Sequence, residues 1–237
     1  MVWAGAPRGS GGLCLHVVMF SWYVFVLSYE TRYLTMLGLD MDNVSYGGQW
    51  KYLTYVNLVL QAVFFGVCVL ADVVVHFLPG GVESLLVDLR DDLFSMFAFP
   101  YSALVFSVFW TAHVAGQAQY TPLVEGEVVP PWLNQARHTG VLLLVLVQMC
   151  VQNHVFSSRL KRVPLTVLSG VLYMAWLLWV HHASGIWVYT FLAKLTPMSV
   201  LVLCGACLVL LLLLQLLGEK LSGTIWANNP GSQKKRN

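Results

Sequence analysis

The chain has 237 residues, of which 58% are hydrophobic and only 10% charged, and its mean hydropathy is +0.70. Soluble domains carry about 25% charged residues, so the composition predicts an integral membrane protein. The formal net charge of +2 is too small and too dispersed to indicate a nucleic acid partner.

Six apolar runs predict six membrane-spanning helices, because each is long enough to cross a bilayer core at about 1.5 Å per residue. They cover residues 13–29, 52–78, 93–115, 132–153, 164–182 and 197–217. The expected fold is an all-α polytopic membrane protein, with six transmembrane helices around an intramembrane pocket and one domain over residues 1–237. Between the second and third runs, residues 82–92 read as a short amphipathic helix, for which we expect an interfacial connector with Asp91 facing water.

Basic residues predict the orientation in the membrane. With both termini cytosolic, about nine of the thirteen Lys and Arg residues face the cytosol, as the positive-inside rule requires. The chain ends Lys234-Lys235-Arg236-Asn237, which is similar to a dilysine retrieval signal, although a basic tail that meets anionic lipid explains it equally simply. The predicted location is therefore the endoplasmic reticulum or the plasma membrane.

Polar residues follow one face of each of two spans. In the second span they recur three, four or seven residues apart, and the fourth span shows a similar stripe, so both stripes should face the bundle interior. The second-span stripe is Thr54, Asn57, Gln61, Cys68, Asp72 and His76, and that of the fourth is Asn134, His138, Gln148 and Gln152.

Thr54 and His138 are the candidate catalytic pair. Each lies six or seven residues beyond a Gly or Pro boundary, Gly48 or Pro131, and the two spans run in the same direction, so we expect both side chains at matched depth, about 9–10 Å from the outer boundary. An imidazole can take the proton of a hydroxyl that attacks an ester carbonyl. Asp72, about 27 Å along the helix from Thr54, is too distant to complete a triad. Taken singly, each residue is better explained as a structural hydrogen-bonding group.

Other residues support weaker alternatives. Cys204 and Cys207 have redox-motif spacing but lack the α/β context of such a motif. Five histidines near span ends invite a haem or metal site, yet the topology gives no clean ligand set, so we predict neither metal nor cofactor. These five are His76, His113, His154, His181 and His182. The aromatic segment around Trp187 and Tyr189 either anchors at the headgroup level or folds back to cover a pocket.

Several segments together resemble the androgen-induced family of multi-pass membrane hydrolases. They include Gly47-Gly48-Gln49-Trp50-Lys51-Tyr52-Leu53-Thr54, Trp132-Leu133-Asn134, His138-Thr139 and Gly185-Ile186-Trp187-Val188-Tyr189. The resemblance implies hydrolysis of fatty acid esters of hydroxy fatty acids, with a threonine nucleophile and a histidine that align with Thr54 and His138. Two stretches depart from the family pattern: Gln135 and Arg137 stand where the family has a His and a Met, and Thr190 stands where it has a Pro.

The predicted function is therefore an intramembrane carboxylic ester hydrolase whose lipid substrate enters from the bilayer. We expect the substrate carboxylate near Lys51 or Arg137. The predicted substrate-binding residues are Lys51, Asn134, Arg137, Trp187 and Tyr189. The rival reading is a non-enzymatic membrane regulator or lipid carrier that uses the same polar interior. The sequence does not predict an oligomeric state.

Overall fold

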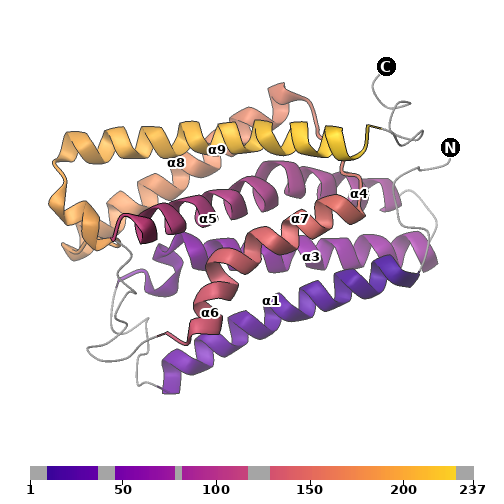
Figure 1. The fold of residues 1–237 in the computed structure, drawn as a ribbon, viewed down its shortest axis with the longest axis horizontal. Helices are drawn as coiled ribbons and strands as arrows, with labels where there is room; N and C mark the ends of the chain where they lie inside the picture. The colour runs from indigo at the N-terminus through magenta and orange to yellow at the C-terminus, as the bar shows by residue number, and fades with distance from the viewer. Residues whose placement is uncertain (1–9, 37–45, 78–81, 117–128, 228–237) are drawn as a thin grey trace.

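The computed structural model describes residues 10–36, 46–77, 82–116 and 129–227, and every regular element in these ranges is helical. The elements run roughly along one axis (Figure 1). They are α1 (Ser10–Met36), η1 (Gly48–Lys51), α3 (Leu53–Phe77), α4 (Val82–Leu93), η2 (Phe94–Ala98), α5 (Phe99–Val114), α6 (Pro131–Gln135), η3 (Ala136–Gly140), α7 (Val141–Val151), α8 (Arg159–Ser184), η4 (Thr190–Lys194) and α9 (Pro197–Ile225).

Five of the helices are long and apolar enough to cross a membrane. The sixth predicted span is the helical run from Pro131 to Val151, which a π-helical turn, η3, divides between α6 and α7. The start of α1 and the end of α9 lie at the same end of the bundle (Figure 1), as an even number of crossings requires. The basic tail that suggested retrieval lies outside the described residues.

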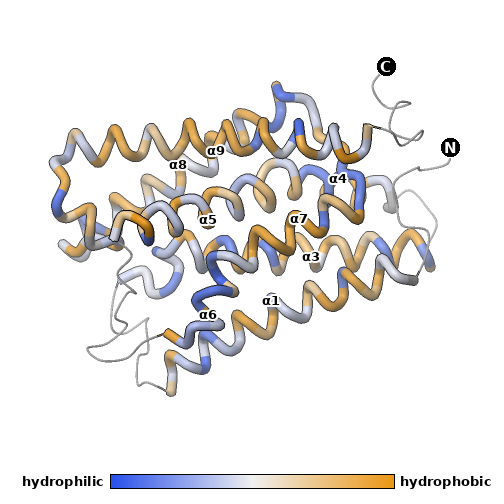
Figure 2. Tube along the Cα trace, viewed as in Figure 1, coloured by the Kyte–Doolittle hydropathy of each residue, from blue (hydrophilic) through white to orange (hydrophobic). Residues whose placement is uncertain are grey.

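The apolar surface and the buried core are what a lipid environment demands of a helical bundle. Hydrophobic residues make up most of each long helix (Figure 2). Many of their side chains are exposed on the outside of the bundle, including Leu172 and Val202. Inside, Tyr23 stacks on Phe65 with ring centroids 5.5 Å apart. Gly218 of α9 brings that helix against Phe99 so closely that a Cβ would lie 2.5 Å from the ring.

The predicted helix at residues 82–92 is present as α4, but the expectation that Asp91 faces water is wrong. A second π-helical turn, η2, joins α4 to α5, so residues 84–114 form one continuous helix that is long and apolar enough to cross a membrane. Asp91, expected in water, is only 4% exposed. A carboxylate can be buried there because Arg90, the ring of His154 and the backbone N–H of Val155 all contact it.

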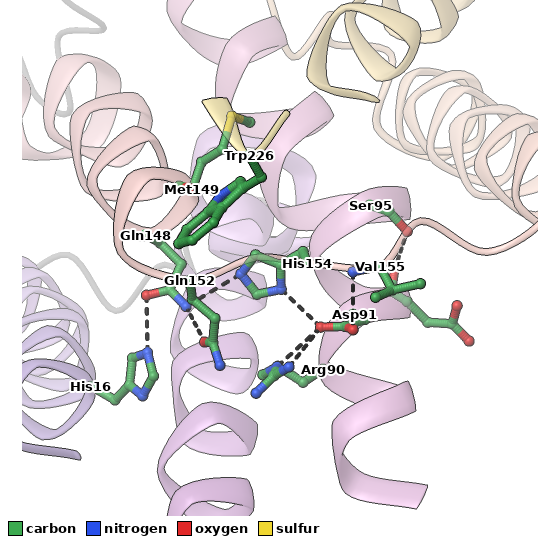
Figure 3. A network of polar contacts seen from close by, with 11 residues as sticks. His16, Arg90, Asp91, Ser95, Gln148, Met149, Gln152, His154, Val155 and Trp226 are labelled. Carbon is green, nitrogen blue, oxygen red and sulfur yellow. Dashed lines mark hydrogen bonds and ion pairs between the residues drawn. The ribbon is translucent and has the colours of Figure 1, made fainter. Parts of the chain in front are cut away.

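Asp91 belongs to a polar network that ties together the end of the bundle where the described chain starts and finishes (Figure 3). Gln148 of α7 lies in the middle, with its amide nitrogen 3.3 Å from His154 Nε2 and its amide oxygen 3.0 Å from His16 Nε2. The other ring nitrogen of His16 lies 2.6 Å from the Asp72 carboxylate. The two predicted polar stripes thus meet, and the link between them is a histidine of α1. The exception to the inward stripe is His76, which is exposed.

Candidate functional site

A cavity of about 290 Å³ lies in the half of the bundle away from that network. Its wall is mostly apolar, with polar groups from α1, α3 and the run from Pro131 to Val151. The polar and aromatic members include Glu30, Tyr52, Thr54, Phe109, His113, Asn134, Arg137, His138, Tyr173 and Tyr189. A chamber of this kind suits a lipid chain with one polar group.

Thr54 lines the cavity from the first turn of α3. The expected depth, which counted six helical residues from Gly48, is wrong for Thr54 because α3 begins only at Leu53. Gly47 and Gly48 adopt positive φ angles of 81° and 50°, which only glycine takes at little cost, and η1 follows them as a 3₁₀ turn. Within the described part of the chain, the Thr54 hydroxyl makes no hydrogen bond, so it does not bond back to its own helix.

His138 lines the same cavity from η3. Its Nδ1 lies 2.9 Å from the carbonyl oxygen of Asn134, one turn earlier. The ring stacks on Phe109 with centroids 3.9 Å apart and an interplanar angle of 13°. Because a carbonyl only accepts, Nδ1 carries the proton and Nε2 is left with a lone pair. This is the tautomer that a general base needs.

The structure therefore brings a hydroxyl and an oriented imidazole to one chamber from two different helices. The backbone carbonyl of Asn134 orients the His138 ring. Asp72 lies at the other end of the bundle, where it is paired with His16. Among the described residues, no group of three or more His, Cys, Asp and Glu side chains is arranged to hold a metal ion.

The segment from Gly185 to Lys194 folds back against the bundle and closes one side of the cavity, through Tyr189, Phe191 and Leu192. This position is the one expected if the segment covers a pocket. The Tyr189 hydroxyl accepts a hydrogen bond from the backbone N–H of Leu53 at 3.2 Å and lies 3.0 Å from the Tyr173 hydroxyl, which donates to the carbonyl of Lys51. Burial raises the pKa of the Tyr189 phenol above its ordinary value, so the group stays protonated and can donate to Tyr173.

The predicted substrate-binding residues divide into two groups. Asn134, Arg137 and Tyr189 line the cavity, whereas Lys51 and Trp187 are not part of its wall. Trp187 stacks on His181 with centroids 3.7 Å apart. Lys51 is buried, its amine lies 5.3 Å from the centroid of the Tyr52 ring, and burial lowers its pKa.

Sequence reasoning missed several residues of the site, among them Glu30, Phe109 and Tyr173. Glu30 pairs with Arg137, with 2.5 Å between Oε1 and Nη1. The first apolar run was expected to end at residue 29, and the helix continues to Met36, so Glu30 fell just outside the predicted span. A single acid within an apolar helix was the available signal. Phe109 and Tyr173 gave none, because aromatic residues are common throughout such spans.

Comparisons with known proteins place the chain in a family that covers most of its length. A family profile described as FAR-17a/AIG1-like protein matches residues 12–223. The androgen-induced gene 1 protein of Homo sapiens is 33% identical over 219 residues, which are 89% of this chain and 92% of that protein. The androgen-dependent TFPI-regulating protein of Mesocricetus auratus is 34% identical over 89% of this chain and 91% of its own length, and that of Homo sapiens is 33% identical over 93% and 96%. No solved structure matches.

Proposed function

Since the chain belongs to the FAR-17a/AIG1-like family, we propose that it hydrolyses long-chain lipid esters inside the membrane, with Thr54 as nucleophile and His138 as base. The observation that carries the proposal is the shared cavity: the unbonded hydroxyl of Thr54 and the oriented ring of His138 line one mostly apolar chamber. The resemblance adds fatty acid esters of hydroxy fatty acids as the substrate class.

The chemistry follows from the tautomer of His138. Its Nε2 takes the proton of the Thr54 hydroxyl as the oxygen attacks the ester carbonyl, and the ring then gives that proton to the departing alcohol. The product is an acyl-threonine, which water hydrolyses with the same base. During the reaction, the Asn134 carbonyl keeps the ring in place and stabilises its protonated form through Nδ1–H.

The first turn of α3 supports the charge that develops on the ester oxygen. Backbone N–H groups at a helix start have no intrahelical carbonyl partner, and the helix dipole is positive there. We assign the backbone N–H of Thr54 as the oxyanion donor. Removing a donor of this kind from a hydrolase typically costs about 10²–10³ in rate.

Purified protein in nanodiscs tests the pair. We expect Thr54→Ala to abolish hydrolysis and labelling by a fluorophosphonate, Thr54→Ser to retain activity, and His138→Ala to lower kcat about 10²–10⁴-fold. Thr224 and His76 provide controls, because both are exposed and lie outside the cavity wall, and His76 Nδ1 contacts the carbonyl four residues earlier as His138 does. Thr224→Ala and His76→Ala should keep full activity.

Undiminished hydrolysis in both Thr54→Ala and His138→Ala would refute the catalytic pair. The alternative of a lipid carrier draws on the apolar wall of the same cavity. It would be favoured if the wild-type protein bound lipid esters without turning them over and Thr54 stayed unlabelled.

A further inference from the structure

An ion pair forms part of the cavity wall beside the catalytic pair. Arg137 directly precedes His138, and its Nη1 lies 2.5 Å from Oε1 of Glu30, which α1 supplies. The two side chains are 13% and 7% exposed, respectively, and both residues line the cavity. The guanidinium of Arg137 in the cavity wall is therefore already matched by an internal carboxylate.

In the described part of the chain, a single contact joins the two side chains, between Arg137 Nη1 and Glu30 Oε1. Within the described residues, Glu30 Oε2 and Arg137 Nε are buried and form no hydrogen bond. Charges attract and repel strongly where water is excluded, and a buried charge without a partner is costly. A lipid carboxylate beside Arg137 would face Glu30 as well and leave one negative charge in excess, whereas an uncharged ester, hydroxyl or amide would not.

We propose that Glu30 determines the charge specificity of the cavity: by holding Arg137 it keeps this end neutral, so the cavity admits lipids with an uncharged group there and disfavours a free carboxylate. The inference rests on the proposed function only in that the same cavity receives a lipid. A substrate that carries a carboxylate, such as a hydroxy fatty acid ester, must then direct that group away from Arg137.

Glu30→Gln tests the inference, because it keeps the shape of the side chain and an oxygen for Arg137 while it removes the negative charge. Binding is measured in the Thr54→Ala background in nanodiscs, where oleate and methyl oleate each displace a fluorescent alkyl probe. We expect Glu30→Gln to tighten the binding of oleate about tenfold and that of methyl oleate less than about threefold, since one close charge contact is involved. Glu30→Gln combined with Arg137→Met should lose the gain for oleate.

Asp88→Asn is the matched control, because it removes an exposed carboxylate from α4 at the other end of the bundle. Asp88→Asn should leave the binding of both oleate and methyl oleate unchanged. An equal effect of Glu30→Gln on both ligands, or no tightening of oleate, overturns the inference. If Glu30→Gln does not fold, the protein with Glu30 intact still decides the question, because oleate binding as tight as that of methyl oleate overturns the inference equally.

Hydrolysis and binding measurements distinguish failure of the proposed function from failure of this inference. If no Thr54-dependent hydrolysis is found and the charge preference in binding still changes with Glu30, the catalytic proposal is refuted and the specificity inference stands. If hydrolysis depends on Thr54 while Glu30→Gln leaves the ratio of free acid to methyl ester binding unchanged, the opposite holds.

Discussion

Replacing Tyr189 by Phe removes one oxygen that joins the covering segment to the start of α3. That oxygen accepts from the Leu53 N–H at 3.2 Å and contacts the Tyr173 hydroxyl at 3.0 Å. Each neutral hydrogen bond contributes about 1 kcal/mol, and the substitution leaves a helix-start N–H without its partner. We expect a loss of about 2 kcal/mol, which for a chain of this size lowers Tm by about 4–8 °C.

Tyr23→Phe is the matched control, because it removes the same atom from another buried ring. Within the described residues the Tyr23 hydroxyl has no hydrogen-bond partner, and its ring stacks on Phe65. An unsatisfied buried hydroxyl costs free energy, so its removal should leave Tm unchanged or raise it. The assay is thermal unfolding in detergent, in which a thiol-reactive fluorophore reports on the exposure of the buried Cys68. Equal shifts in the two variants, or no shift for Tyr189→Phe, would refute the assignment of the hydrogen bonds.

Three further predictions concern the packing and the polar network. Gly218→Ala should lower the free energy of unfolding by about 1–3 kcal/mol, because the new Cβ would lie 2.5 Å from the Phe99 ring, whereas Gly205→Ala, with open space around it, should be neutral or stabilising in the same melts. Asp91→Ala should cost about 3–5 kcal/mol by leaving its buried partners unpaired, and a milder loss in denaturant titration would contradict this. Burial lowers the pKa of His154, so the folded protein favours the neutral ring. The stability that the neutral ring contributes is present above about pH 6.5 and is lost as the pH falls. A change from pH 7.5 to 5.5 should therefore lower Tm more in the wild type than in His154→Gln.

The sequence determined the class of fold and the identity of the candidate pair. Apolar runs give the spanning helices because a bilayer leaves the backbone few alternatives to a helix, and the inward polar stripes follow from helical periodicity together with the cost of polar groups in lipid. Thr54 and His138 stood out because each polar residue follows a Gly or Pro by six or seven residues in the sequence.

Only the tertiary structure decided what surrounds these groups. At η2 and η3 the backbone hydrogen bonds span one residue more than in an α-helix, and the hydrophobic periodicity of the sequence does not reveal this change. The π-helical turn η2 is what joins α4 to α5. The partners of His138, Arg137 and Asp72 are Phe109, Glu30 and His16, which come from other helices and lie between 29 and 107 residues away along the chain. Pairing between distant side chains depends on how the helices pack and rotate against one another, and local sequence carries no record of that choice.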